Sequence, residues 1–231
     1  RHLAGPAVKV IITRSGGEAV EVKLQPQQIA AVSPSPDKHL QQLAADRAAR
    51  HAAAAEALVK SRLEAQRKAA KLLERAADQP QDLKPIVIEA ESLTSQQGGQ
   101  VEITESKIGA RGKSFLHWDD EGHAITYYFN VPQDGIYQVG MKYAARDDRV
   151  RRRVEFNPRG EQFQTMDVEL PASGGWSNQR DDWLLAPLDD PATDQPWLVE
   201  LKKGRHRLRL TALNRALNLD YIVLTPPGTQ L

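Results

Sequence analysis

Three carboxylates near the two ends of one β-patterned region could together bind a hard metal ion. Glu89 and Glu91 lie in the segment Ile-Glu-Ala-Glu at residues 88–91, and Asp220 lies in Asn-Leu-Asp-Tyr-Ile at residues 218–222. On a strand, residues two apart project from the same face, and an antiparallel neighbour would bring Asp220 beside them. Such an oxygen-rich site suits Ca²⁺. The alternative is that the two glutamates face solvent on an edge strand.

A second group of titratable side chains, His117-Trp-Asp-Asp-Glu-Gly-His123, has the composition of a metal site or an acid/base site. Its spacing matches neither His-Glu-x-x-His nor a Cys/His zinc framework. The sequence also contains no Gly-x-Ser-x-Gly elbow, Walker loop or dinucleotide fingerprint. We therefore interpret residues 119–122 as a polar turn between strands and predict that the chain is not an enzyme.

The strongest local positive charge comes from a group of arginines: Arg146, Arg149, Arg151, Arg152 and Arg153. Guanidinium groups pair bidentately with carboxylate or sulfate, so this group could favour uronic acids or sulfated glycans. On a strand, alternate members would face opposite sides, and only some of them could meet a ligand. The alternative is a solvated edge that protects against strand addition.

Composition limits the class of protein. The chain has 231 residues, a formal net charge of +1 and no cysteine. The near-zero charge predicts no nucleic-acid partner, and the lack of cysteine excludes disulfides, thiolate metal sites and thiol nucleophiles. No apolar run approaches the length of a membrane span, so we predict no membrane partner. The first residues lack an initiating methionine and a signal-peptide core, which is typical of a piece of a longer chain with further domains.

The first segment, residues 1–32, has the pattern of a β-hairpin. Two alternating runs flank the turn residues Ser15-Gly-Gly17. The stretch from Gly5 to Leu24 resembles the last two strands of a bacterial PDZ domain. The earlier strands and the peptide-binding loop of such a domain are missing, so the resemblance implies no peptide binding here. A hairpin that lies on the rest of the fragment is the alternative.

The second segment, residues 33–80, has the composition of one long helix. Residues 37–78 are rich in alanine and contain no glycine or proline, and Ser35-Pro36 suits a helix start. Unbroken, such a helix would be about 60 Å long. We interpret it as a rigid spacer or as a coiled-coil arm that mediates oligomerisation. Two shorter helices packed as a hairpin are the alternative.

The third segment, residues 81–231, switches to short alternating strands separated by turns, which is typical of a β-sandwich. We predict a mainly β fold in which a jelly-roll sandwich follows the helix and the hairpin. The predicted strands are Ile86 to Glu91, Val101 to Thr104, Ser114 to Trp118, Ala124 to Val131, Gly135 to Ala144, Val150 to Phe156, Gln164 to Leu170, Trp197 to Leu201, His206 to Ala212 and Leu219 to Thr225.

The order and spacing of several motifs in this third segment resemble the carbohydrate-binding modules of families 6 and 35, which are galactose-binding-like β-sandwiches. The resemblance covers about residues 85–226. It is carried by the motifs at residues 88–91, 123–135, 137–144, 173–176, 203–208 and 218–222. It implies that Glu89, Glu91 and Asp220 ligate a structural calcium ion that ties the first strand to the last.

The same resemblance implies a sugar site in the loops at one end or edge of the sandwich. Sugars stack an apolar pyranose face on an aromatic ring, while polar side chains satisfy their hydroxyl groups. Trp176 or Trp183 would provide the ring and Asn218 a hydroxyl partner, with His117 and Trp118 at the rim. Either Trp176 or Trp183 could instead belong to the core, and Asn218 could instead brace the loop that enters the last strand.

Together these features predict a non-catalytic carbohydrate-binding module of a larger exported protein, which is secreted, periplasmic or on the cell surface. Its partner would be a polysaccharide or oligosaccharide. The alternative is a structural or protein-interaction sandwich with an oligomerising helix and no sugar site.

Overall fold

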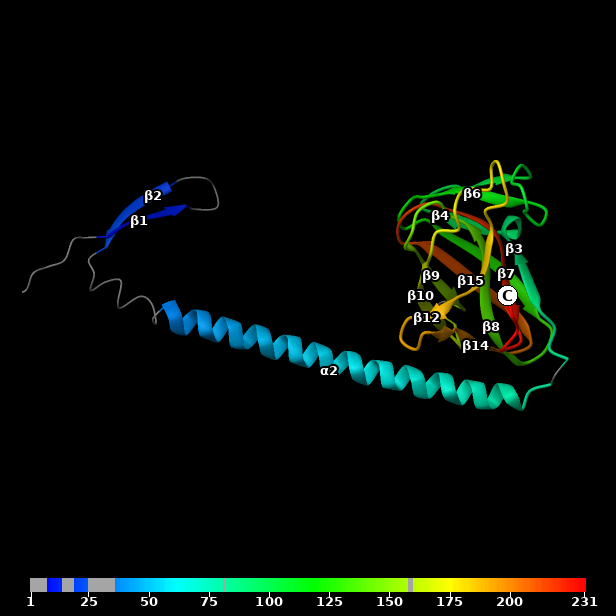
Figure 1. Ribbon diagram of the computed structural model, residues 1–231, viewed down its shortest axis with the longest axis horizontal. Coiled ribbons are helices and arrows are strands. Elements are labelled where there is room, and N and C mark those ends of the chain that lie inside the picture. The colour runs from blue at the N-terminus through cyan, green and yellow to red at the C-terminus, as the bar shows by residue number, and fades with distance from the viewer. Residues whose placement is uncertain (1–7, 14–18, 25–35, 81, 158–159) are drawn as a thin grey trace, which may run out of the picture. The chain divides into compact units, whose positions relative to one another are not determined.

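The computed structural model of the protein describes residues 8–13, 19–24, 36–80, 82–157 and 160–231 (Figure 1). The chain divides into two compact units, Arg1–Lys60 and Ser61–Leu231. Each unit is described by itself below.

The first unit contains the predicted hairpin. Strands β1 (Val8–Thr13) and β2 (Ala19–Leu24) pair antiparallel, in a register that runs from Val8 opposite Leu24 to Thr13 opposite Ala19. The alternating β-branched residues explain this pairing. The predicted turn at residues 15–17 lies outside the described residues, and the resemblance to a PDZ domain stays a prediction.

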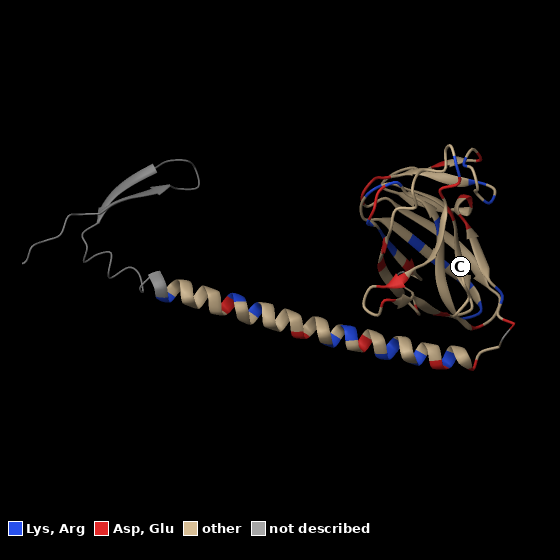
Figure 2. Cartoon of the chain, in the orientation of Figure 1, with Lys and Arg blue, Asp and Glu red and all other residues tan. Residues whose placement is uncertain are grey.

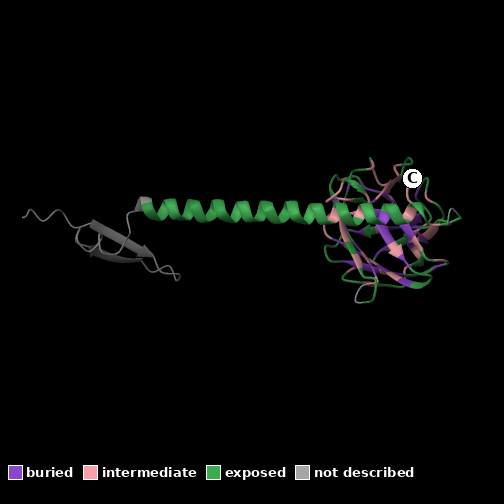
Figure 3. Ribbon diagram, turned by 90° about the horizontal axis from the view of Figure 1, so that it is seen from below, coloured by how far each residue is buried: buried purple, intermediate pink, exposed green. Residues whose placement is uncertain are grey.

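The predicted long helix is confirmed as one continuous element, α2 (Pro36–Ala77), of 42 residues. Its alanines favour helix throughout, and the proline stands in the first turn, where its missing N–H is tolerated. Lysine and arginine are interspersed with acidic residues along the helix (Figure 2). Side chains 38–64 are all exposed, which appears as the long green stretch in Figure 3.

The last turns of α2 pack on the sandwich within the second unit. The more buried positions, Ala65, Ala69, Leu72 and Ala76, recur every three or four residues and so form one helix face. Leu72 belongs to a small apolar cluster on the sandwich surface, which it forms with Ile136 and Leu198.

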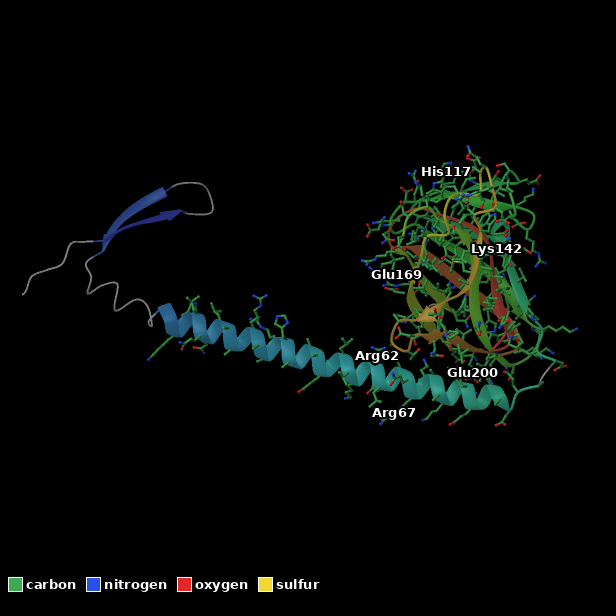
Figure 4. All side chains as sticks on the ribbon, viewed as in Figure 1. Arg62, Arg67, His117, Lys142, Glu169 and Glu200 are labelled. Carbon is green, nitrogen blue, oxygen red and sulfur yellow. The ribbon has the colours of Figure 1, made fainter. Side chains whose placement is uncertain are left out.

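Polar contacts fix the same turns of α2. The Arg75 guanidinium donates to both carboxylate oxygens of Glu200, and the Gln79 side chain both donates to and accepts from the Ile136 backbone. Nearer the middle of the helix, Arg62 pairs with Asp194 at 2.8 Å. Arg62 and Glu200 are labelled in Figure 4. The expected spacer is therefore anchored to the sandwich along its last turns.

The predicted β-sandwich is confirmed, and one of its two sheets has five strands. These strands are β4 (Ser95–Gln97), β7 (Ala124–Val131), β9 (Val150–Phe156), β10 (Gln164–Leu170) and β15 (Gly204–Ala212). Their order is β10-β9-β15-β7-β4, so neighbours in space are mostly distant in sequence.

The other sheet has seven strands and holds the residues of interest. Its strands are β3 (Ile86–Glu89), β5 (Glu102–Thr104), β6 (Ser114–Trp118), β8 (Gly135–Ala144), β11 (Leu184–Pro187), β14 (Leu198–Leu201) and β16 (Leu217–Thr225). The main path is β11-β8-β16-β6-β5, with β14 also paired to β8 and β3 to β16. A two-stranded ribbon, β12 (Asp189–Asp190) with β13 (Gln195–Pro196), lies outside both sheets.

Side chains from both sheets form a single hydrophobic core that includes Phe115, Tyr127, Tyr143, Phe156 and Trp197. The core follows from strict alternation in strands such as β9, where every second residue is buried.

The edges of the elements depart from prediction in places. The first sandwich strand ends at Glu89, because residues Ala90–Ser92 form a 3₁₀ turn, η1. The short strands β4 and β11 were not predicted, since their segments show little alternation.

Candidate functional site

A hollow of about 500 Å³ opens beside strands β5, β6 and β16, and we call it the hollow below. His117, one of its residues, is labelled near the uppermost end of the sandwich in Figure 4. Besides the strands, the segments 105–113 and 171–183 contribute side chains. The lining residues are Glu102, Thr104, Ser106, Lys107, Leu116, His117, Asp119, Trp176, Asn178, Ala216 and Asn218. The structure thus brings together three of the predicted sugar-site residues: Trp176, Asn218 and His117.

Trp176 is half-buried and sits in a loop that the backbone holds tightly. Gly174 has a φ of +112°, which favours glycine, and a Cβ at Gly175 would collide with the Asp182 carboxylate and displace it. The Asp182 carboxylate accepts hydrogen bonds from the Ser177 amide at 3.1 Å and from the Arg180 guanidinium. The Arg180 contact holds the pKa of Asp182 below its usual range. The indole is therefore presented by a fixed loop.

Asn218 braces the loop that carries Trp176, whereas the sequence alternative had it brace the loop that enters the last strand. It is only 4 % exposed on β16, and its side-chain amide donates to the Trp176 carbonyl at 3.1 Å. The same side chain lines the hollow. Asn218 thus braces the tryptophan loop and borders the space where a ligand would lie.

His117 lies at the rim, as predicted, with its side chain 61 % exposed. Its φ is +65°, a left-handed conformation that is uncommon for a residue other than glycine. Its Nε2 atom is 3.7 Å from the Glu102 carboxylate.

The prediction that Trp118 lies at the rim is wrong. Trp118 is fully buried, packs edge-on against Phe115, and donates its indole N–H to the His123 carbonyl. The left-handed turn at His117 explains this, because it breaks the two-residue alternation of β6 and rotates the next side chain into the core.

Arg152 contacts both Trp118 and the segment that precedes β16. Its fully buried guanidinium lies 4.2 Å from the centre of the Trp118 ring and donates to the carbonyls of Trp118, Asn214 and Arg215. Burial lowers the pKa of Arg152 to about 9, while the carbonyl acceptors keep it charged at neutral pH. Arg152 therefore belongs to the core and not to a ligand-binding group of arginines.

Two further predicted residues are not in the lining of the hollow. Trp183 is half-buried and donates its indole N–H to the Ile108 carbonyl at 3.0 Å, with the Lys142 ammonium 5.8 Å from the ring centre. Trp183 therefore contacts the segment 105–113, and its predicted part in sugar binding stays a prediction. Arg146 is exposed in the segment after β8.

Sequence analysis missed Lys107 and Asn178, which contact each other in the hollow although they are 71 residues apart. Burial lowers the pKa of the Lys107 ammonium, and the neighbouring Glu102 carboxylate opposes that shift. Both residues lie in irregular segments whose composition carries no motif.

The predicted carboxylates lie at a different place on the seven-stranded sheet. Strand β16 pairs antiparallel with β3, which places Tyr221 opposite Glu89 and confirms that the first and last strands are neighbours. The register of β16 against β8 shifts between Leu219 and Tyr221, so Asp220 occupies an irregularity of the strand. Glu91 lies in η1, and the prediction that Glu89 and Glu91 share one strand face is wrong.

These three carboxylates, which we call the carboxylate cluster, differ in exposure, because the Asp220 side chain is fully buried and the Glu89 side chain is 31 % exposed. Asp220 is fully buried and accepts from the Arg111 amide and from the Lys142 ammonium, the latter at 2.9 Å. Burial raises the pKa of Glu89, Arg111 opposes the shift, and the charges of Glu91 and Asp220 add to it.

The fit of this cluster to a calcium ion is mixed. The Oε2 atoms of Glu89 and Glu91 are buried and have no hydrogen-bond partner among the described residues, as expected of oxygens that face a cation. Against this, the Lys142 ammonium already neutralises Asp220, and no three Asp, Glu, His or Cys side chains in the described part of the chain are grouped closely enough to hold a metal. Calcium stays a prediction, carried by the two glutamates.

Comparison with solved structures identifies neighbours of the sandwich. The sandwich is similar to carbohydrate-binding modules of families 6 and 35. One neighbour is the C-terminal family 6 module of LamC, a marine laminarinase from Zobellia galactanivorans, with 22% identity and a TM-score of 0.47 over 62% of this chain and 99% of that one. Another is a family 35 module from Clostridium thermocellum, with 19% identity and a TM-score of 0.46 over 61% and 97% of the two chains.

A third neighbour is a family 6 module of Cellvibrio mixtus lichenase 5A in complex with cellotriose, with 24% identity and a TM-score of 0.44 over 63% and 98% of the two chains. No protein-family model matches the sequence, and no curated protein sequence does. Among the described helices, none is long and apolar enough to cross a membrane.

Proposed function

We propose that the sandwich is a non-catalytic carbohydrate-binding module that holds part of a polysaccharide or oligosaccharide in the hollow. The observation that carries the proposal is the meeting of a half-buried indole, Trp176, with the amide of Asn218 in one open hollow. A pyranose ring can stack on the indole while the surrounding amides, carboxylates and ammonium satisfy its hydroxyl groups. As the sequence resemblance implies, we propose that the module serves a larger exported protein, which is secreted, periplasmic or on the cell surface.

The expected affinity is weak, because one aromatic platform in an open hollow removes little sugar surface from water. We expect dissociation constants on the order of micromolar to millimolar, equivalent to roughly 4 to 8 kcal/mol.

Isothermal titration against a panel of neutral and acidic polysaccharides tests the proposal. We expect at least one glycan to bind, and Trp176→Ala to reduce its affinity at least about tenfold, because the stacking surface is lost. Phe163→Ala is the matched control, since Phe163 is an exposed aromatic directly before β10 and is not part of the hollow. If no glycan binds, or if Trp176→Ala binds like wild type, the structural or protein-interaction module with an oligomerising helix becomes the better account.

We further propose that Glu89 and Glu91, with Asp220 beside them, hold a structural Ca²⁺. The support is the pair of buried glutamate oxygens without hydrogen-bond partners among the described residues. When bound, the ion would supply positive charge that stabilises these carboxylates in their ionised form. The melting experiment in the Discussion tests this proposal.

A further inference from the structure

Lys107 places a nearly buried ammonium group at the hollow. The residue is 9 % exposed and lines the same hollow as Trp176 and Asn218. Among the described residues, its ammonium donates a hydrogen bond only to the side-chain oxygen of Asn178. An ammonium carries three N–H groups, so donors remain for a bound molecule.

Because the Lys107 ammonium has lost water, a hydrogen bond from it to a ligand oxygen should be energetically favourable. A buried cation that has lost water and has few protein partners gains more from a new hydrogen bond than an exposed one does. The lowered pKa of Lys107 has the same physical cause. The exposed Lys113 of the same segment differs, because it pairs with Glu105 at 3.0 Å.

The charges around Lys107 indicate what kind of acceptor the hollow takes. Two carboxylates, Glu102 and Asp119, line the hollow together with the one ammonium. A glycan that carries carboxylate or sulfate groups would meet two negative charges and one positive charge. A neutral sugar avoids this repulsion, and its hydroxyl oxygens still accept from Lys107.

The arginines that could have favoured acidic glycans do not alter this balance. Arg152 is buried in the core, and Arg153 forms a bidentate pair with Asp167 on the five-stranded sheet. Neither these two nor Arg146 is among the residues that line the hollow.

We propose that Lys107 is the specificity-determining residue of the hollow: its ammonium donates to a hydroxyl oxygen of an uncharged sugar stacked on Trp176, while Glu102 and Asp119 exclude polyanionic glycans. This inference rests on the proposed function and adds the class of ligand and the residues that select it.

Affinity measurements on the full chain test the inference with two probes, a soluble neutral β-glucan and polygalacturonate. We expect wild type to bind the neutral glycan at least about tenfold more tightly than the polyanion. Lys107→Met, which keeps an unbranched side chain one atom shorter and removes the donor, is expected to weaken neutral-glycan binding about tenfold. Lys113→Met is the matched control and is expected to bind like wild type.

Two further measurements separate a ligand contact from a merely structural role. The affinity of wild type for the neutral glycan is expected to fall as pH rises through the lowered pKa of Lys107, because deprotonation removes the charged donor, whereas Lys107→Met shows no such fall. The double variant Glu102→Gln and Asp119→Asn is expected to bind polygalacturonate more tightly than wild type does.

Each outcome gives a decision. If wild type binds neither probe nor any glycan of the wider panel, the proposed function fails and this inference fails with it. If wild type binds the neutral glycan and a folded Lys107→Met variant binds it equally, the role of Lys107 is overturned while the proposed function stands. If wild type prefers polygalacturonate, the exclusion of polyanions is overturned.

Discussion

The hollow and the carboxylate cluster are two polar regions built from the same elements, and they differ in how their charged side chains are partnered. Strand β16 supplies Asn218 to the hollow and Asp220 to the cluster. The segment 105–113 also serves both regions, because the Lys107 side chain lines the hollow and the Gly109 carbonyl accepts from the Lys142 ammonium at the cluster.

The two regions differ in whether their charged side chains are fully paired within the protein. At the cluster, the buried carboxylate of Asp220 is satisfied within the protein by Lys142 and by the Arg111 amide. At the hollow, the Lys107 ammonium keeps free donors among the described residues, and His117 and Asp119 stay exposed. Polar groups paired inside the fold contribute stability, whereas polar groups left open can bind a ligand.

The largest expected effect comes from breaking the buried pair at the cluster. Asp220→Ala leaves the Lys142 ammonium, whose side chain is 18 % exposed, without its carboxylate. Removing one partner of a buried pair destabilises a protein by about 3 to 5 kcal/mol, and urea unfolding measures this loss. Asp194→Ala is the control, because that carboxylate pairs with Arg62 in solvent and its loss is expected to cost less than about 1 kcal/mol. Equal stability of Asp220→Ala and wild type would contradict the comparison.

The next largest effect concerns calcium. A native-state ligand at 100 times its dissociation constant stabilises a protein by about 2.7 kcal/mol, so calcium should raise the melting temperature and a chelator should lower it. In Glu91→Gln the response to calcium should be lost.

The raised pKa of Glu89 gives this experiment a pH dependence. Burial raises the pKa of Glu89 because it disfavours the ionised carboxylate. In the presence of chelator, the ionised Glu89 therefore destabilises the folded protein at neutral pH. This destabilisation is lost as pH falls through the folded-state pKa, because the carboxylate becomes protonated. Glu89→Gln in chelator should therefore be at least as stable as wild type at pH 7. Identical melting curves with and without calcium would overturn the proposal of a structural Ca²⁺.

The smallest expected effect on stability comes from Asn218→Ala. It removes one neutral hydrogen bond to the Trp176 carbonyl, so the free energy of unfolding should fall by only about 1 kcal/mol. Its effect on glycan affinity should be larger, about tenfold or more, because both the amide and the position of the indole are lost. Titration and urea unfolding of the same variant give the two numbers. A large loss of stability with unchanged affinity would show that Asn218 belongs with Asp220 as a structural residue.

The fold was predictable because its strands alternate regularly and its breaks carry turn residues. Strands β7 to β10 have the predicted bounds, and alternation is clear along β7 and β9. The neighbourhood of β3 and β16 was predictable from two motifs at the ends of the sandwich.

The site was less predictable, because its residues depend on local backbone and on loops that meet only in three dimensions. His117 and Trp118 were both expected at the rim, but the left-handed conformation of His117 turns Trp118 into the core. Lys107 and Asn178 carry no periodic signal, and only the packing of two distant loops brings them together. Trp176 and Trp183 could not be separated by sequence, since only the packing of the loops places Trp176 in the hollow and brings the Trp183 indole to the Ile108 carbonyl and to Lys142.

The anchoring of α2 has a consequence for where the sandwich domain should be cut. A fragment that starts at residue 81, the predicted start of the sandwich segment, would expose the apolar surface of Ile136 and Leu198 that Leu72 covers. It would also leave Glu200 without the Arg75 guanidinium. The compact unit begins at Ser61. The last turns of the helix cover apolar surface of the sandwich, so a fragment that omits them should aggregate more readily than one that starts at Ser61.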